Sequence, residues 1–371
     1  MANEKKTVRE PSFILALIPI VAMIGFMLYC FRGHSESGYH DAHMPLVLSI
    51  VVACIVGAIC GHSFKEMLAG MSERLAASME AVLILCTVGF LVSSFMASGA
   101  IPSLIVYGLD LLTPKLFLPI GCILCAIVGM ACGSSWTTTA TIGLAFLGIG
   151  AGLGIPAPIT AGMIISGAYV GDKFSPLSDT TNLAAAVAET GLFDHVTAMV
   201  STTGPTLLLS LILYTILGLN VDTSAYDATV AEGIQEAFRS AFTISPILLL
   251  PIIVVIVMCI LRVPGLVGIA ISVATATIFM MIFQSTDIYG SRALGDIFNM
   301  LHNGIVVETG NDVADSILGK AGGMNGTMWT INLILLALAY GGALERCGCV
   351  ERLFGGLKHK IHSVGSLILA T

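Results

Sequence analysis

The sequence predicts an all-α fold, a polytopic bundle of transmembrane helices, and two features of its composition lead to this prediction. The 371-residue chain is 56% hydrophobic and only 11% charged, and its mean hydropathy is +0.95. A soluble domain carries about a quarter charged residues. The apolar residues are also gathered into runs about as long as a bilayer requires. These features exclude an ordinary soluble domain.

Six apolar runs are predicted to be membrane helices. The first, residues 12–31, is too long for the apolar core of a signal peptide, and further runs follow it, so we expect it to remain in the protein. The second, residues 44–61, contains no charged residue. The remaining four occupy residues 206–219, 241–261, 266–283 and 329–344.

The distribution of Lys and Arg predicts how the chain is oriented in the membrane. The segments 1–11, 62–78 and 346–360 carry these cations, and all three fall on one side if the chain crosses the membrane in order. We therefore expect a multi-pass protein of the cytoplasmic membrane with a cytoplasmic N-terminus and an external segment at 32–43. The role of residues 284–327 is left open.

A weak internal repeat relates residues 78–105 to residues 327–354. Gly99 aligns with Gly348 at an offset of 249 residues, and the charge distribution makes the two copies cross the membrane in opposite directions. Opposed copies are typical of transporters that are built from inverted repeats. The repeat therefore predicts an inverted architecture with broken or re-entrant helices.

The repeat also predicts how the chain divides into halves. We expect residues 1–220 to form a first half with a complete polar motif, and residues 240–371 to form a second, inverted and incomplete half. A position 249 residues after Gly133 would lie near 382, beyond Thr371. We therefore expect the chain to be truncated at its C-terminus, without its second polar motif.

Five hydroxyl side chains follow Gly133, directly after an apolar run at 117–132. Backbone that is unwound inside a membrane has to be buried in protein or line a wet cavity, and serine and threonine can hydrogen-bond the freed backbone groups. Hydroxyl oxygens are also hard ligands that suit a hard cation. We therefore predict a helix break from Gly133 to Gly143 with cation ligands at Ser134, Ser135, Thr137, Thr138 and Thr139.

A second polar stretch, GDKFSPLSDTTN, occupies residues 171–182. Gly171 and Pro176 disrupt helices, and the two aspartates, seven residues apart, would share a face if the stretch were helical. A carboxylate inside a membrane is a functional group by default, because it can bind sodium when ionised and a proton when neutral. We predict that Asp179 binds the cation and the proton and that Asp172 supports it, with further ligands at Ser178, Thr180 and Asn182.

The alternative interpretation of these stretches is structural. Asp172 and Lys173 could form a solvated cytoplasmic turn, and the hydroxyls after Gly133 could serve only to pack helices. The coincidence of two polar breaks in one half of the chain favours the functional interpretation.

The stretches GSSWTTTATIG and GDKFSPLSDTTNLAA resemble the signature motifs of the NhaC family of sodium/proton antiporters, and the resemblance extends from about residue 12 to the end of the chain. It implies secondary exchange of sodium for protons across the cytoplasmic membrane. It also implies two inverted halves and a translocation site within 134–139 and 172–182. Some members resemble malate/lactate exchangers coupled to sodium and protons, and these motifs do not separate the two activities.

Other function classes are disfavoured. The sequence contains no P-loop and no evident nucleophile–base or metal-ligand arrangement, so we expect neither an enzyme nor a bound cofactor. The expected partners are sodium ions, protons and the lipid bilayer, together with a small carboxylate in the alternative activity. Nucleic acid is not expected, and a homodimer is left open. A membrane protein that does not transport in this form is the remaining alternative.

Three smaller motifs receive structural interpretations. Cys122 and Cys125 are expected to pack as small hydrophobes rather than bind a metal. The glycines of residues 148–154 favour close helix packing over a dinucleotide-binding loop, which would need a preceding strand. The sequence HDAH at 40–43 is expected to be a solvated external loop, with metal binding or pH sensing as alternatives.

Overall fold

Helices make up the fold of the part of the chain that the computed structural model describes. The described residues are 9–32, 41–133, 135–175, 178, 180–181, 184–185, 190–220, 228–261, 263–305, 307–319 and 322–358. No β-strand occurs among these residues, which confirms the predicted all-α class.

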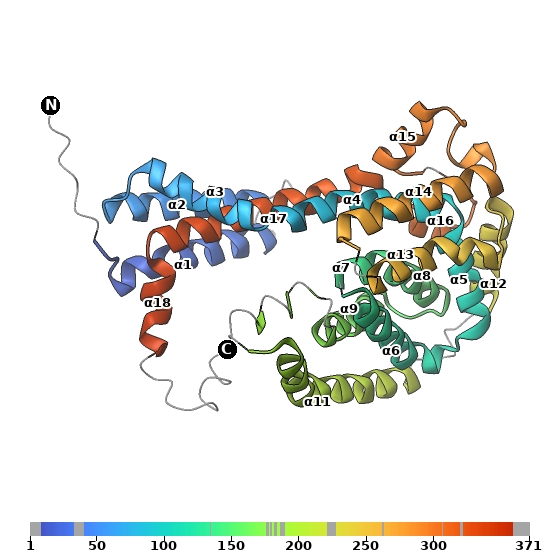
Figure 1. The fold of residues 1–371 in the computed structure, drawn as a ribbon, viewed down its shortest axis with the longest axis horizontal. Helices are drawn as coiled ribbons and strands as arrows, with labels where there is room; N and C mark the ends of the chain where they lie inside the picture. The colour runs from blue at the N-terminus through green and yellow to red at the C-terminus, as the bar shows by residue number, and fades with distance from the viewer. Residues whose placement is uncertain are drawn as a thin grey trace. The chain divides into compact units, whose positions relative to one another are not determined.

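The helices follow one another as labelled in Figure 1. Those of the first part of the chain are α1 (Phe13–Phe31), α2 (His43–Ile59), α3 (Phe64–Ala77), α4 (Met79–Ala97), α5 (Ala100–Leu111), α6 (Pro114–Cys132), α7 (Ser135–Thr138), η1 (Thr139–Gly143), α8 (Leu144–Gly152) and α9 (Ala157–Phe174). Those of the second part are α11 (Leu192–Leu219), α12 (Ala228–Ala241), η2 (Pro246–Leu249), α13 (Leu250–Ile260), α14 (Gly265–Phe283), η3 (Thr286–Ile288), α15 (Leu294–Asn303), α16 (Asp312–Leu318), α17 (Gly323–Arg346) and α18 (Cys349–Lys358).

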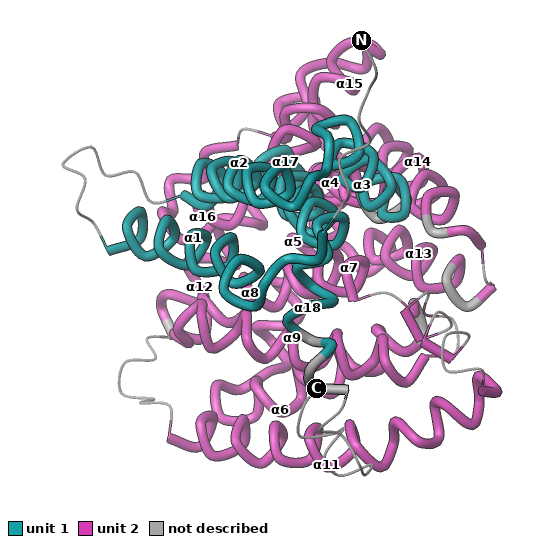
Figure 2. The backbone as a smooth tube through the Cα atoms, turned by 90° about the vertical axis from the view of Figure 1, so that its left-hand side faces the viewer, with its two compact units in different colours: residues 1–82, 328–371 teal, residues 83–327 magenta. Residues whose placement is uncertain are grey.

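The chain forms two compact units, which Figure 2 distinguishes by colour. Unit 1 consists of residues 1–82 and 328–371, and unit 2 consists of residues 83–327. Each unit contains residues from both predicted halves, 1–220 and 240–371. The division into units therefore does not test whether the chain is built from two inverted halves.

Unit 1 is held together by small residues that allow its helices to approach closely. Ala53 of α2 and Ala343 of α17 are fully buried in its core. A Cβ atom added to Gly342 of α17 would lie 2.6 Å from the backbone oxygen of Gly70 on α3. Only glycine fits at such a crossing, and small residues are the common means of bringing membrane helices together.

Unit 2 has a larger apolar core, which includes Phe95, Phe117 and Phe238 at 0% exposure. The Gln284 side chain, which is 6% exposed, hydrogen-bonds the backbone of the segment between α12 and η2. Its Oε1 accepts from the Thr243 amide (3.0 Å), and its Nε2 donates to the carbonyls of Thr243 (3.1 Å) and Ser98 (3.0 Å). The side chain thereby satisfies backbone groups that the helix break would otherwise leave unpaired in the core.

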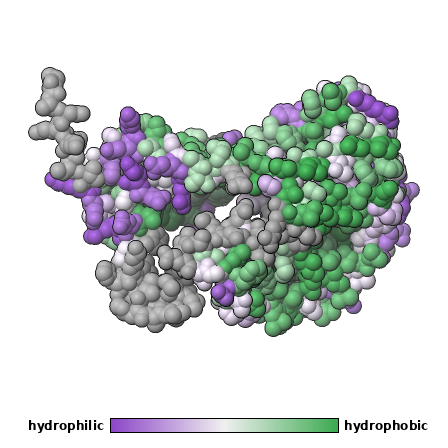
Figure 3. Space-filling view, viewed as in Figure 1, coloured by the Kyte–Doolittle hydropathy of each residue, from purple (hydrophilic) through white to green (hydrophobic). Residues whose placement is uncertain are grey.

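The described helices are consistent with a multi-pass membrane protein. Four of them, α1, α11, α14 and α17, are long and apolar enough to cross a membrane, and the number rises to six if each of two bent helix pairs counts as one span. The most apolar window of α11 contains no buried residue, as expected of a helix that faces lipid. Figure 3 shows apolar surface over the helices of unit 2 and polar side chains gathered over α3 and α18 of unit 1.

Two sequence predictions about these segments are wrong in detail. The run 241–261 was predicted to be helical from its first residue, but the apolar helix begins at Pro246, after a bend of 91° that separates it from helix Thr229–Ala241. The polar segment 62–78 was treated as a connection, but it forms α3. That helix begins with a capping box, in which Ser63 and Glu66 each accept from the other's backbone amide.

The backbone repeats its pattern at the spacing that the sequence suggests. Gly99, between α4 and α5, has a φ angle of 80°, and Gly348, between α17 and α18, has a φ angle of 70°. Both values lie in the left-handed region that favours glycine. Helices α1 and α14, which precede these pairs at a similar offset, are each 19 residues long. The alignment of Gly99 with Gly348 therefore corresponds to a shared local structure.

Candidate functional site

The first predicted break begins where the sequence places it. Helix α6 ends at Cys132, and Gly133 adopts a φ angle of 62° while its amide donates to the carbonyl of Gly129 (2.8 Å). Glycine is favoured in this left-handed conformation at the end of a helix. The predicted start of the break at Gly133 is therefore confirmed.

From Ser135 onward the chain is helical, which corrects the prediction of a break as far as Gly143. Helix α7 continues through the π-helical turn η1 into α8. The Thr139 hydroxyl donates to the carbonyl of Ser135 (2.8 Å), and the Thr141 hydroxyl donates to that of Thr137 (2.7 Å). Single π-helical turns of this kind are often found at functional sites.

Burial separates the predicted hydroxyl ligands into two groups. Ser135 and Thr137 are each 5% exposed and Thr138 is fully buried, so these three side chains face the protein interior. Thr139 is exposed and its hydroxyl bonds to backbone. Ser134 lies outside the described residues.

Helix α9 lies against α6 through two glycines one turn apart. A Cβ atom on Gly171 would lie 2.3 Å from the carbonyl oxygen of Ala126, and a Cβ atom on Gly167 would lie 2.3 Å from that of Cys122. The obstacle in both cases is backbone, so neither position has room for a side chain. The prediction that Gly171 breaks the helix is wrong, because α9 continues to Phe174 and Gly171 serves close packing instead.

This packing brings the two polar stretches together at Asp172, in the last turn of α9. The Ser135 hydroxyl donates to Oδ2 of Asp172 (3.0 Å) across 37 residues of sequence. The other carboxylate oxygen, Oδ1, is buried and has no hydrogen-bond partner among the described atoms. An unpartnered polar atom is costly to bury, and buried atoms of this kind are rare enough to need an explanation.

The segment after α9 folds back on the end of that helix. The Thr181 hydroxyl, on a side chain that is 4% exposed, donates to the carbonyls of Asp172 (3.3 Å) and Lys173 (3.4 Å). The Ser178 hydroxyl is buried and shares a hydrogen bond of 2.9 Å with Thr180, which is exposed. Asp179 and Asn182 lie outside the described residues.

Thr181 is a residue that the sequence analysis missed in favour of its neighbour Thr180. Adjacent positions of an irregular segment give no periodic pattern, so nothing in the sequence distinguishes the threonine that contacts α9 from the one that faces outward. The helix end between Asp172 and Asp179 also removes the condition under which the two aspartates would share a helical face.

The arrangement can hold either a cation or a proton. The charged oxygen Oδ1 is removed from water, and each of these species would satisfy it. Oxygen atoms of carboxylates and hydroxyls are the ligands that hard cations prefer. Among the described residues, no group of three or more His, Cys, Asp and Glu side chains is placed to hold a metal ion.

The motifs with structural interpretations agree with those interpretations. Cys122 and Cys125 are fully buried, in the surface of α6 that receives Gly167. In the 148–154 motif, a Cβ atom on Gly150 would lie 2.5 Å from the Thr160 hydroxyl oxygen, and one on Gly152 would lie 2.7 Å from the Leu109 side chain. Close helix packing is therefore confirmed for both motifs.

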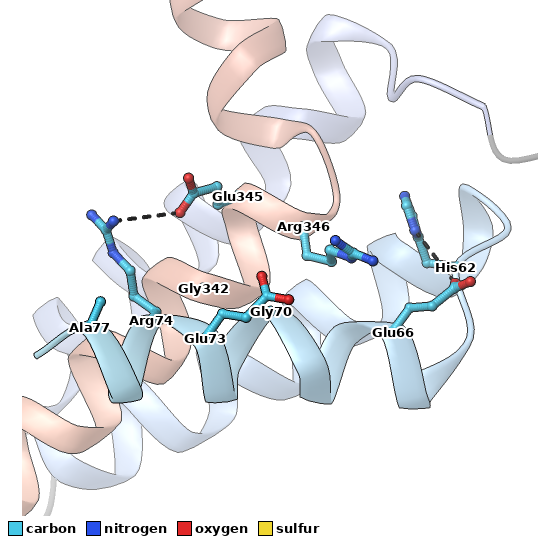
Figure 4. A pocket seen from close by; sticks show the side chains of 9 residues that line it. All are labelled: His62, Glu66, Gly70, Glu73, Arg74, Ala77, Gly342, Glu345 and Arg346. Atoms are coloured by element: carbon cyan, nitrogen blue, oxygen red, sulfur yellow. Dashed lines mark ion pairs between the residues drawn. The ribbon is translucent and has the colours of Figure 1, made fainter. Parts of the chain in front are cut away.

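A polar pocket of about 550 Å³ lies within unit 1, between α3 and the end of α17 (Figure 4). The Arg74–Glu345 ion pair joins α3 to α17, and His62 and Glu66 form a second pair at the start of α3, each with an N–O distance of 3.8 Å. The side chains of Arg74 and Glu345 are exposed, and pairs of this kind contribute little to stability. The lining residues of α3 lie in the segment 62–78 and Arg346 lies in the segment 346–360, both of which the Lys and Arg distribution predicts to be cytoplasmic. The lining residues are His62, Glu66, Gly70, Glu73, Arg74, Ala77, Gly342, Glu345 and Arg346.

Comparison with known proteins gives a consistent set of relatives. The pattern of the Na⁺/H⁺ antiporter family matches residues 167–371. The arginine/ornithine antiporter ArcD of Halobacterium salinarum is 36% identical over 98% of this chain and 73% of its own length. The Na⁺/H⁺ antiporter NhaC of Alkalihalophilus pseudofirmus is 35% identical over 89% of this chain and 70% of its own. The malate-2H⁺/Na⁺-lactate antiporter of Bacillus subtilis is 32% identical over 99% of this chain and 76% of its own. No solved structure matches the chain.

Proposed function

Because the chain belongs to the Na⁺/H⁺ antiporter family, we propose that it is a secondary active transporter that exchanges sodium ions for protons across a membrane. The observation that carries this proposal is the environment of Asp172. One carboxylate oxygen accepts from Ser135 at 3.0 Å, and the other is buried without a partner among the described residues.

The exchange follows from competition for one oxygen atom. A neutral Asp172 carries its proton on Oδ1, whereas an ionised Asp172 offers that atom to a sodium ion. Arrival of sodium therefore releases the proton, so that Asp–COOH and Na⁺ become Asp–COO⁻·Na⁺ and H⁺. Leaving Oδ1 charged and empty in a buried position is unfavourable, which discourages movement of the site without cargo. An obligatory exchange of the two ions is the expected result.

The remaining ligands are proposed from the same two stretches. Ser135 orients the carboxylate by donating to Oδ2. Thr137 and Thr138, which follow Ser135 closely in the sequence, are also buried. Ser178 is buried on the returning segment after α9. Ser134, Asp179 and Asn182 complete the proposed set, with Asp179 as the second titratable ligand. Thr139 and Thr180 are proposed as peripheral members, because both are exposed.

The proposed location is the cytoplasmic membrane, with the N-terminus in the cytoplasm. Two groups of contacts within unit 1 support the grouping of these segments by side of the membrane, on which the proposed orientation is based. Arg74, in the segment 62–78 that is predicted to be cytoplasmic, lies 3.8 Å from Glu345, which directly precedes the segment 346–360. His43, in the segment 32–43 that is predicted to be external, contacts Trp329, which lies at the opposite end of α17 from the segment 346–360. The two inverted halves, 1–220 and 240–371, remain part of the proposal.

A second candidate function is sodium- and proton-coupled exchange of a small organic solute. It is favoured by the names of two relatives, an arginine/ornithine antiporter and a malate-2H⁺/Na⁺-lactate antiporter. The identity to them is similar to the identity to the NhaC protein. The same oxygen atoms would then couple the ions to movement of the solute.

Proton flux in proteoliposomes distinguishes the candidates. An inward sodium gradient should drive proton movement, reported by a pH-sensitive dye, with no organic solute present. Flux that requires arginine and ornithine, or malate and lactate, would favour the second candidate. Absence of sodium-dependent flux with every solute would refute both.

A further inference from the structure

A histidine of unit 1 is held between two groups that can only accept hydrogen bonds. Nδ1 of His43 lies 2.6 Å from Oδ1 of Asp41, and Nε2 lies 3.1 Å from the backbone oxygen of Trp329. The indole of Trp329 in turn donates to Oδ2 of Asp41 (3.0 Å), and the two rings meet edge to face with centroids 5.2 Å apart. Asp41 and Ala42 lie in a connection, as predicted, but the side chains of Asp41 and His43 are paired and only partly exposed, and His40 lies outside the described residues.

The two contacts of the ring require two N–H donors. A neutral imidazole has one donor and one acceptor, whereas an imidazolium has two donors. An ionised carboxylate and a backbone carbonyl both accept only. The observed geometry is thus that of protonated His43, and loss of the proton would leave a lone pair of Nε2 facing the Trp329 carbonyl.

The charges around the ring favour the protonated form. The His43 side chain lowers the pKa of Asp41 to about 2, and Asp41 raises the pKa of His43 above its usual value. Among the described residues, Asp41 is the charged group that acts on the ring, and α17 contributes the backbone carbonyl of Trp329. Because the pKa of His43 is raised in the folded protein, the contacts of its ring with Asp41 and Trp329 are fully formed below pH 6.5. They are lost as the pH rises through the raised pKa of His43.

The cluster joins the first residue of α2 to the first turns of α17. Both lie in unit 1, and both belong to ends that the Lys and Arg distribution predicts to be external. We infer that Asp41, His43 and Trp329 form a proton-operated latch between α2 and α17, closed when His43 is protonated, through which external pH regulates transport. The regulatory part rests on the proposed ion exchange, and the latch itself does not.

Tryptophan fluorescence tests the latch without any transport assay. The chain contains two tryptophans, Trp136 and Trp329, so Trp136→Phe leaves Trp329 as the single reporter. Protonated imidazole quenches indole emission, and the emission of Trp329 should therefore rise with pH, with a midpoint above 6.5. Asp41→Asn should move the midpoint down towards 6.5, and His43→Gln should abolish the transition. His302→Gln, on α15 of unit 2, is the matched control and should leave it unchanged.

The flux assay then tests the regulation. Sodium-driven proton flux of the full chain should change with external pH around the same midpoint, and that step should be absent in His43→Gln while His302→Gln keeps it. The inference is wrong if Trp329 emission titrates alike with and without His43, or if Asp41→Asn leaves the midpoint in place. It is equally wrong if the wild-type and His43→Gln flux profiles superimpose. A protein that carries no sodium-driven flux but keeps the fluorescence transition would refute the proposed exchange and the regulation, and leave the latch standing.

Discussion

At the scale of single residues, the asymmetry of the Asp172 carboxylate is the central feature. Oδ2 has a donor in Ser135, and Oδ1 is buried with no donor in the described part of the chain. The sequence could indicate the residue types, because an acid and hydroxyls inside an apolar chain are expected to be functional. It could not indicate which of two adjacent serines reaches the carboxylate, since that depends on the left-handed turn at Gly133 and on the rotation of α7.

Replacement of Ser135 by alanine should weaken sodium binding. The substitution removes a hydrogen bond to a charged group, which is worth about 1.5–3 kcal/mol, so the sodium concentration for half-maximal flux should rise by roughly tenfold or more. Thr139→Ala is the matched control, because that hydroxyl bonds to backbone and the side chain is exposed. Flux titrated with sodium measures both, and an equal effect of the two substitutions would contradict the role given to Ser135.

At the scale of helices, the sequence predicted where apolar helices run and where the first one of the site ends. Helices α1, α2 and α14 begin and end within two residues of the predicted runs 12–31, 44–61 and 266–283, because a long uncharged run has few other ways to satisfy its backbone in a membrane. Breaks were harder to predict. Gly133 does end a helix, whereas Gly171 packs inside one, and only the neighbouring backbone of α6 distinguishes these two uses of glycine.

The packing of α9 on α6 should be sensitive to a single methyl group. In Gly171→Ala the new Cβ would meet three backbone atoms of α6 within 2.8 Å, and overpacking of this kind typically costs about 1–3 kcal/mol. We expect a lower midpoint of thermal unfolding in detergent and reduced exchange, because Asp172 is the next residue. Gly162→Ala on the same helix meets its nearest atom, the Tyr214 hydroxyl oxygen, at 3.6 Å, and should unfold like the wild type. Equal thermal stability of both variants would show that the helices are not packed as described.

At the scale of the whole molecule, the proposed orientation specifies on which side of the membrane each connection lies. Cysteine labelling with a reagent that does not cross membranes tests this in a background without the native cysteines. Glu36→Cys should be labelled from outside intact cells, and Arg352→Cys should be labelled only after the cells are opened. Labelling of position 352 from outside would overturn the orientation and, with it, the inverted arrangement of the repeat.

The central claim is that the carboxylate of Asp172 carries sodium and protons in turn. Its most direct test is sodium-driven proton flux in proteoliposomes that contain equal amounts of wild-type protein, Asp172→Asn and the control Asp194→Asn, which alters an exposed aspartate at the start of α11. Asparagine keeps the size of the side chain but neither titrates nor carries charge. We expect sodium-driven proton flux in the wild type and in the control, and none in Asp172→Asn at any sodium concentration or pH. Wild-type flux from Asp172→Asn would contradict the central claim.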